Sequence, residues 1–235
     1  MSEEAITQDH GGVALSHVIV RATGKRREAG VILFPTVMGV SPLEIGFAHD
    51  LAALGYDALV ADFYGRRFTP DERADAVQAM NGLKEDRAAL RDRLLAILGA
   101  AVDATGLGEA RLASTGYCFG GMCCLDLART GVGIAGVAAF HGLFDPPGLA
   151  PKPIAAKVIA YHGWDDPLAP PDKVVAFAQE MTDAGADWQL HAFGHTGHGF
   201  TNPHATGAIA GVKYQPDAAA RSWRGLTDFL AELFG

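Results

Sequence analysis

The sequence predicts an α/β fold with one mostly parallel central sheet and helices on both faces. Short apolar runs of strand length alternate with longer segments that have helical periodicity. Most of the short runs are continuously apolar, which is typical of parallel strands buried on both faces. The chain has 235 residues, of which 49% are apolar and 20% charged. This length and composition are sufficient for one folded domain with a full core.

The expected strands are identified by their apolar runs and by the turn residues that bound them. The first is expected at residues 13–21, after a loose N-terminal segment over residues 1–12. The others, in chain order, are residues 30–34, 56–62, 111–115, 133–140, 157–161 and 188–193. The sequence contains no internal repeat and no low-complexity linker, so we expect a single domain over residues 1–235.

The expected helices lie between these strands. The first begins at Ser41-Pro42-Leu43-Glu44, which combines a serine N-cap, a proline in the first turn and a glutamate three residues after the cap. It is expected to stop at Gly55, because glycine commonly ends a helix. The further expected helices cover residues 71–80, 83–104, 122–130, 171–184 and 217–234, the last of them capped by Asp217.

A glycine-rich turn at residues 116–121 carries the main chemical signal. Its sequence, Gly-Tyr-Cys-Phe-Gly-Gly, joins the predicted strand 111–115 to a helix. A strand, a tight turn, a nucleophile and a helix form a nucleophile elbow, here with Cys118 in the usual place of serine. Gly116 and Gly120 lack a Cβ atom, so the strand and the helix can approach closely. The helix N-terminus beside the sulfur favours the thiolate of Cys118.

Candidates for a base and an acid follow the next two predicted strands. A thiol nucleophile needs a base, and the base needs an acid that orients it. Asp165 and Asp166 come after the strand that ends near residue 161, and His195 and His198 come after residue 193. Ligands in such sheets bind outside the carboxyl ends of the strands, so these residues are expected at the same edge as the elbow.

These motifs resemble the dienelactone hydrolase family of α/β-hydrolases over roughly residues 13–234. The similar segments are the elbow at 116–121, Phe-Tyr-Gly-Arg at 63–66 and Gly-His-Gly-Phe at 197–200. The resemblance implies an α/β-hydrolase fold with Cys118 as nucleophile, His198 as general base and Asp166 as the orienting acid. Asp166 is favoured over Asp165 because the family places its acid three residues after a glycine and four before a proline.

The resemblance also implies an oxyanion hole made by the backbone N–H groups of Val37 and Phe119. Each such donor stabilises the transition state by about 3–4 kcal/mol. Six further residues are expected to line the substrate pocket: Thr36, Tyr64, His141, Trp164, Phe200 and Asn202.

The sequence departs from the family pattern at three places. Thr36 stands where the dienelactone enzymes have a glutamate that takes part in activating the thiol. Asn202 lies near the position of an arginine that holds the substrate carboxylate, and the segment of the second arginine is shortened near Arg73 and Asp75. We therefore expect a small ester or lactone that is less anionic than dienelactone, cleaved without a cofactor.

The sequence is also compatible with other functions. The chain fits a carboxylesterase or thioesterase of broad specificity, since the catalytic residues would be the same. It also fits a binding or redox-sensing protein on a hydrolase fold, because a reactive thiolate oxidises readily and Thr36 removes a carboxylate. We expect Cys123 and Cys124 to be core residues on the helix behind the elbow.

Composition argues against several partners. The formal net charge is −8 and no basic run is present, which argues against nucleic-acid binding. No stretch approaches the roughly 18 apolar residues of a membrane span. The acidic start lacks a signal pattern, so we expect a cytoplasmic monomer or homodimer. The three cysteines fit neither a disulfide framework nor a zinc pattern. The glycines beside His195, His198 and His204 argue against a metal site.

Overall fold

The computed structural model describes residues 2–235 and contains an eight-stranded sheet in the order β1-β2-β4-β3-β5-β6-β7-β8. The strands are β1 (Glu3–His10), β2 (Val13–Val20), β3 (Gly30–Phe34), β4 (Asp57–Val60), β5 (Leu112–Tyr117), β6 (Gly136–Phe140), β7 (Lys157–Gly163) and β8 (Trp188–Phe193). The pairs that involve β1 and β2 are antiparallel, and all neighbours from β4 to β8 are parallel. The predicted mostly parallel sheet is confirmed.

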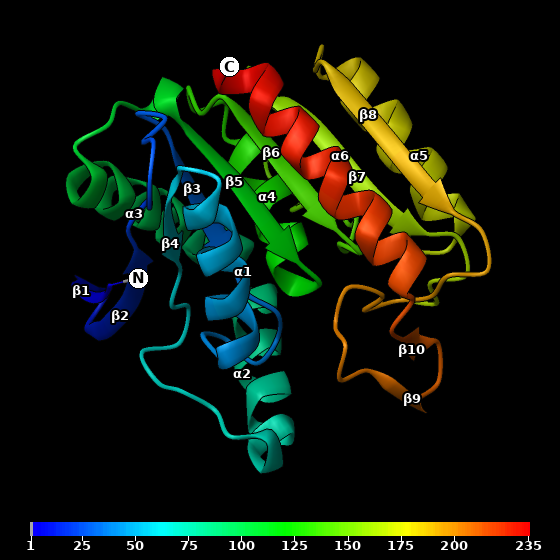
Figure 1. Cartoon of the computed structure of the whole chain (residues 1–235). Helices are drawn as coiled ribbons and strands as arrows, with labels where there is room; N and C mark the ends of the chain where they lie inside the picture. The colour runs from blue at the N-terminus through cyan, green and yellow to red at the C-terminus, as the bar shows by residue number, and fades with distance from the viewer. Residues whose placement is uncertain (1) are drawn as a thin grey trace.

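Helices cover both faces of this sheet, as predicted (Figure 1). They are α1 (Pro42–Ala53), α2 (Arg73–Glu85), α3 (Arg87–Thr105), α4 (Phe119–Arg129), α5 (Pro171–Asp183) and α6 (Pro216–Phe234), with short 3-10 turns at Pro70–Glu72 and Glu109–Arg111. The buried apolar residues of α1 and α6 pack on one face, and those of α3, α4 and α5 pack on the other. No helix within residues 2–235 has both the length and the apolar character needed to cross a bilayer.

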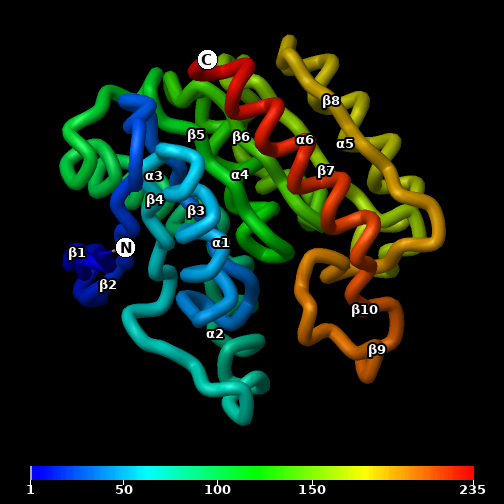
Figure 2. The backbone as a smooth tube through the Cα atoms, viewed as in Figure 1, coloured from blue at the N-terminus to red at the C-terminus, as the bar shows by residue number. Residues whose placement is uncertain are grey.

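Five parallel strands, β3, β5, β6, β7 and β8, lie side by side in that order. Because parallel strands end at the same edge, the loops that follow them meet there. The tube in Figure 2 shows α2 and a small hairpin, β9 (Thr206–Ile209) with β10 (Val212–Lys213), near this carboxyl edge. The sheet therefore gathers segments that are more than 150 residues apart in the sequence at one edge, from residue 36 to residue 198.

The expectation of a loose N-terminal segment is wrong for residues 3–10. This segment is β1, which pairs antiparallel with β2 along its whole length, from Glu3 opposite Val20 to His10 opposite Val13. Gly11 and Gly12 both have positive φ, +62° and +77°, and form the two-residue turn that a tight hairpin requires. The strand was missed because it is an edge strand with mostly exposed polar residues, so its apolar alternation is weak.

Two helix boundaries and one hairpin differ from the sequence prediction. The break between α2 and α3 lies at Asp86, whose side chain accepts a hydrogen bond from the N–H of Ala89 at 2.9 Å. Gly82 therefore lies inside α2 and does not end it. The last helix starts at Pro216, so Asp217 is a first-turn acid and not the cap. The β9–β10 hairpin, exposed and short, had not been expected.

Candidate active site

The turn between β5 and α4 holds Cys118 in a backbone conformation that non-glycine residues rarely adopt, with φ +59° and ψ −116°. The glycines on either side allow this turn. A Cβ atom on Gly116 would lie 2.1 Å from the carbonyl oxygen of Gly120, and one on Gly120 would lie 2.1 Å from that of Phe34. Only glycine fits at both positions, and the resulting turn leaves the Cys118 side chain partly exposed at the end of the sheet.

The loops after β7 and β8 bring Asp166 and His198 together. His198 Nδ1 lies 2.7 Å from Asp166 Oδ2, and the two residues are 4% and 1% exposed. The other carboxylate oxygen of Asp166 accepts the N–H of Leu168 at 2.8 Å, which fixes the carboxylate. An aspartate on Nδ1 favours the tautomer that carries the proton there, so Nε2 is left to act on the thiol. The alternatives, Asp165 and His195, are both exposed.

Charge in this site is arranged around the sulfur. Burial alone would raise the pKa of the Cys118 thiol, but His198 and the backbone N–H groups of Phe119 and Val37 lower it below its ordinary value. Burial would likewise lower the pKa of His198, and the facing Cys118 sulfur together with Asp166 raises it instead. These opposite shifts favour a thiolate beside an imidazolium.

The loop after β3 brings its backbone to the same sulfur. Val37 is 7% exposed and its N–H group interacts with Cys118, as does the N–H of Phe119 at the start of α4. Two backbone donors from separate loops therefore face the same sulfur. Tyr64 supports this loop, since its hydroxyl donates a hydrogen bond to the carbonyl oxygen of Val37 at 3.2 Å. The hydroxyl of Thr36 is also engaged, with Glu44.

His141, at the end of β6, is buried between the elbow and the histidine loop. Its Nδ1 accepts the backbone N–H of Cys118 at 3.1 Å, and its Nε2 lies 2.8 Å from the hydroxyl of Thr201. Its ring meets that of His198 edge to face, with centroids 5.0 Å apart. Burial, with a smaller contribution from His198, lowers the pKa of His141 well below 6.5, which favours the neutral imidazole. The residue joins two parts of the site and is 1% exposed.

The other expected pocket residues are placed in three different ways. Trp164 is 43% exposed on the loop that precedes Asp166. The side-chain oxygen of Asn202 accepts the N–H of His204 at 2.9 Å and so stabilises its own turn. Phe200 is fully buried and packs edge to face on His141, with ring centroids 5.1 Å apart, so it belongs to the core beneath the site.

The sequence reading missed one buried acid at this site. The sequence pattern predicts only that Glu44 belongs to a helix start. In the structure it is 0% exposed and accepts hydrogen bonds from the N–H and the hydroxyl of Thr36. A signal was present in the sequence. Glu44 precedes Ala48, Leu51 and Ala52 by four, seven and eight residues, and all four are buried on one face of α1.

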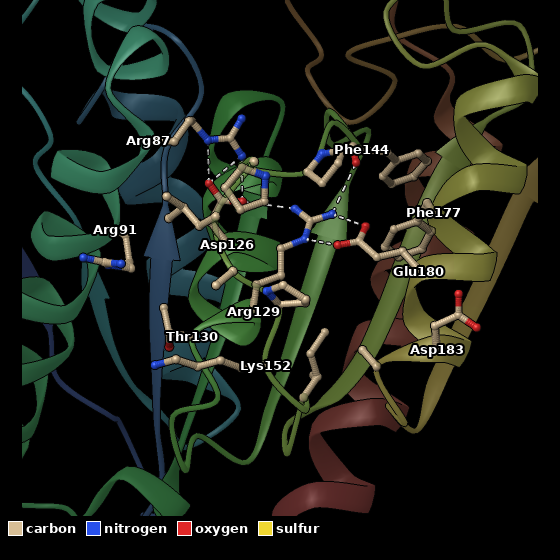
Figure 3. A pocket seen from close by; sticks show the side chains of 18 of the residues that line it. Arg87, Arg91, Asp126, Arg129, Thr130, Phe144, Lys152, Phe177, Glu180 and Asp183 are labelled. Carbon is tan, nitrogen blue, oxygen red and sulfur yellow. Dashed lines mark hydrogen bonds and ion pairs between the residues drawn. The ribbon is translucent and has the colours of Figure 1, made fainter.

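A cavity of about 970 Å³ lies elsewhere, between α4, α5 and the loop around residues 144–154, and none of the candidate site residues lines it. Its walls are mostly apolar, and its most buried charges are paired (Figure 3). Arg87 and Arg129 both bind Asp126, and Arg129 also binds Glu180. Within residues 2–235, no group of three or more His, Cys, Asp or Glu side chains is placed to hold a metal ion.

Comparisons with known proteins identify a family. The sequence model of the dienelactone hydrolase family matches residues 15–234. A curated relative from Bradyrhizobium, named as a probable 2-oxo-3-(5-oxofuran-2-ylidene)propanoate lactonase, is 26% identical over 214 residues, which cover 87% of this chain and 84% of the relative.

Two solved structures are similar over the whole chain. The structure named m3DLH has a TM-score of 0.89 and 31% sequence identity, with 100% of this chain and 99% of that chain covered. A dienelactone hydrolase-like promiscuous phosphotriesterase from metagenomic libraries has a TM-score of 0.86 and 31% identity, with the same coverage.

Proposed function

The chain belongs to the dienelactone hydrolase family and is a hydrolase of esters or lactones, and we propose that it cleaves a small, weakly anionic ester or lactone through Cys118, His198 and Asp166. One observation carries the proposal. The His198–Asp166 pair, joined at 2.7 Å, and two backbone N–H groups converge on the Cys118 sulfur. This arrangement supplies a nucleophile, a base with a fixed tautomer and an oxyanion hole.

The first half of the reaction forms an acyl-enzyme. In the thiolate–imidazolium pair the thiol proton already lies on His198, and the sulfur attacks the carbonyl carbon. The carbonyl oxygen becomes negatively charged and is stabilised by the N–H groups of Phe119 and Val37. The tetrahedral intermediate then collapses. The carbon–oxygen bond of the ester breaks, the leaving alkoxide takes the proton from His198, and a thioester on Cys118 remains.

The second half uses water. His198 takes a proton from a water molecule, whose oxygen attacks the thioester carbonyl in the same oxyanion hole. The carbon–sulfur bond breaks, the carboxylic acid leaves and His198 again faces the Cys118 thiolate. For a lactone, the alcohol stays attached to the acyl group after the first step. It can close the ring again, so hydrolysis competes with reclosure.

The charges around the site support a substrate that carries less negative charge than dienelactone. The two arginines that follow Tyr64 are already paired, Arg66 with Glu72 at 2.7 Å and Arg67 with Asp62 at 3.2 Å. Asn202, near the place of a substrate-binding arginine in the family, stabilises its own turn. A substrate carboxylate would therefore find no unpaired guanidinium among these residues. A neutral ester or lactone needs no such ion pair for binding.

The test is a parallel assay of 4-nitrophenyl acetate, a neutral lactone and dienelactone, with Cys118→Ala as the inactive variant. We expect turnover of the first two substrates, weaker turnover of dienelactone, and no activity in Cys118→Ala. Cys123→Ala is the matched control, because Cys123 is fully buried on α4 and burial raises the pKa of its thiol. Activity in Cys118→Ala equal to that of the parent would contradict the nucleophile assignment.

The same assay distinguishes the proposed function from the alternative functions. Similar rates over acyl esters and thioesters of many chain lengths would identify a broad carboxylesterase or thioesterase. One equivalent of product without further turnover would instead indicate a binding or redox-sensing protein with a reactive thiol.

A second candidate is phosphotriester hydrolysis, favoured by the similarity to the promiscuous phosphotriesterase. The Cys118 thiolate would attack phosphorus, and the two N–H donors would bind the phosphoryl oxygen. Paraoxon in the same assay tests this activity, since release of nitrophenol by the parent and not by Cys118→Ala would support it.

A further inference from the structure

Glu44 is a carboxylate placed where the apolar face of a helix would ordinarily carry a hydrophobic residue. It is 0% exposed and lies in the first turn of α1. One oxygen accepts two hydrogen bonds from Thr36, from its N–H at 3.1 Å and from its hydroxyl at 2.8 Å. The other oxygen accepts the hydroxyl of Ser41. Burying a carboxylate is costly, and such a group is normally retained only with several hydrogen bonds.

These contacts do more than cap α1. In a capping box, the glutamate three residues after the cap binds the backbone N–H of the cap residue. Here the Glu44 carboxylate binds only the side chain of Ser41 and turns its other oxygen to Thr36, eight residues earlier in the chain. The carboxylate thus joins the start of α1 to the loop that follows β3.

In the loop that follows β3, hydrogen bonds hold the backbone on both sides of the Val37 N–H. Glu44 holds the N–H and the hydroxyl of Thr36, and the carbonyl oxygen of Thr36 accepts the N–H of Gly39 at 3.0 Å. The carbonyl oxygen of Val37 accepts the Tyr64 hydroxyl at 3.2 Å. The peptide N–H between these bonds is the one that interacts with the Cys118 sulfur.

We propose that Glu44 is a positioning residue that holds Thr36 and thereby aims the Val37 N–H into the oxyanion hole. The inference rests on the proposed function. It also gives the Thr36 replacement a structural role, because a threonine hydroxyl can donate to the Glu44 carboxylate whereas a second carboxylate there would repel it. Without Glu44, the N–H of the partly buried Thr36 loses its acceptor, and the loop is no longer held in its present orientation.

Four variants test this role. Glu44→Leu removes both hydrogen bonds to Thr36 at similar volume, and Glu44→Gln keeps an oxygen that can accept them. Thr36→Val removes the hydroxyl, which donates to Glu44 and accepts the N–H of Met38 at 3.4 Å, and keeps the backbone bond to Glu44. It replaces Glu44→Leu in the test if that variant does not fold. Asp57→Asn is the matched control, because Asp57 is also a buried carboxylate, 1% exposed, that accepts a backbone N–H, from Ala22. It lies at the start of β4, at the opposite edge of the sheet.

Two reactions of Cys118 distinguish positioning from simple loss of structure. Acylation by 4-nitrophenyl acetate, measured as a burst, uses the oxyanion hole. Alkylation by iodoacetamide, measured at a pH where its rate no longer rises, uses the thiolate but forms no oxyanion. For Glu44→Leu we expect acylation to fall by about 10- to 100-fold, somewhat less than the roughly 10²–10³ for complete loss of one donor. The limiting rate of alkylation by iodoacetamide and the KM for 4-nitrophenyl acetate should change little.

The other variants complete the comparison. Glu44→Gln should acylate within about fivefold of the parent, since a neutral acceptor replaces a charged one. Thr36→Val should show a smaller fall in acylation than Glu44→Leu. Asp57→Asn should lower stability and leave the acylation rate of the folded protein unchanged.

Three outcomes would overturn the inference: parental acylation in Glu44→Leu, an equal loss of acylation and alkylation in that variant, or a Glu44→Gln variant as slow as Glu44→Leu. If Glu44→Leu does not fold, parental acylation in Thr36→Val would overturn it. A parent that does not acylate at all would instead refute the proposed function, and the role of Glu44 with it.

Discussion

The two loops that we propose to supply the N–H groups of an oxyanion hole are held in different ways. The elbow after β5 is held by its own backbone, with φ +59° at Cys118 and glycines on both sides that no larger residue could replace. The loop after β3 is held by side chains from elsewhere, Glu44 of α1 and Tyr64 after β4. The first loop takes its shape from six consecutive residues that pack closely on the backbone at the end of β3, and the second depends on side chains from separate elements.

This difference has a consequence for mutation. A backbone-built turn tolerates no change at its glycines, because a clash with backbone atoms cannot be relieved by a side-chain rotation. A loop held by several hydrogen bonds should lose function stepwise, since each bond contributes only about 0.5–1.5 kcal/mol.

The largest effect is expected for Gly120→Ala. The added Cβ would lie 2.1 Å from the carbonyl oxygen of Phe34 and 2.5 Å from that of Pro35, so β3 and α4 would have to move apart. We expect a loss of about 3 kcal/mol or more in the free energy of unfolding, measured by chemical denaturation, and no acylation of Cys118. Gly82→Ala is the control. Nothing lies within 4 Å of its Cβ position in α2, and it should stabilise by about 0.5–1 kcal/mol. A Gly120→Ala variant as stable and active as the parent would contradict the close approach.

The next effect is expected for Asp166→Asn. An amide cannot fix the His198 tautomer as the carboxylate does, so kcat should fall by about 10³- to 10⁴-fold with little loss of folded protein. Steady-state kinetics and thermal unfolding measure the two quantities. Asp165→Asn, an exposed neighbour, should remain near the parent. If Asp165→Asn proved the more damaging change, the acid would be misassigned.

A smaller effect, dependent on pH, is expected in the reactivity of Cys118. Because the pKa of Cys118 is lowered, the parent should react with iodoacetamide well below the ordinary thiol pKa of about 8.5. In His198→Ala the cause of the lowering is largely removed while burial still raises the pKa, so the midpoint of the rate profile should move above about 8.5. At pH 7 the variant should react at least about tenfold more slowly. Coincident profiles would rule out the thiolate–imidazolium pair.

The same pKa shifts predict how stability changes with pH. The raised pKa of His198 stabilises the fold below its unfolded pKa of about 6.5, and this contribution is lost as the pH rises through the folded value. The lowered pKa of Cys118 stabilises the fold above its unfolded pKa, and that contribution is lost as the pH falls through the folded value.

The smallest effect is expected for Tyr64→Phe. The change removes the hydrogen bond to Val37 and keeps the ring that packs edge to face on Phe63 and Phe68. Since Glu44 still holds the loop, kcat should fall by no more than about tenfold and the free energy of unfolding by about 1 kcal/mol. A loss above about 100-fold would show that the hydroxyl takes part in the reaction itself.

The elements that could be predicted from the sequence are those with a strong local pattern. The buried strand β3 is a continuous apolar run, β5 leads directly into the elbow, and the elbow is a short motif whose glycines dictate its shape. Weak or local patterns misled the prediction elsewhere. The edge strand β1 is largely polar, and the predicted break at residues 81–82 lies inside α2, because the Asp86 cap decides where α3 begins.

For the site, the sequence by itself determined the nucleophile turn and the set of acids and histidines that follow the strands. Among them, the fold buries Asp166 and His198 together after β7 and β8 and leaves Asp165 and His195 exposed, which supports the proposed pair. Tertiary structure alone gave Glu44, Tyr64 and His141 their partners. Their hydrogen bonds join segments distant in the sequence, so they exist only once the sheet has brought its strand ends to one edge.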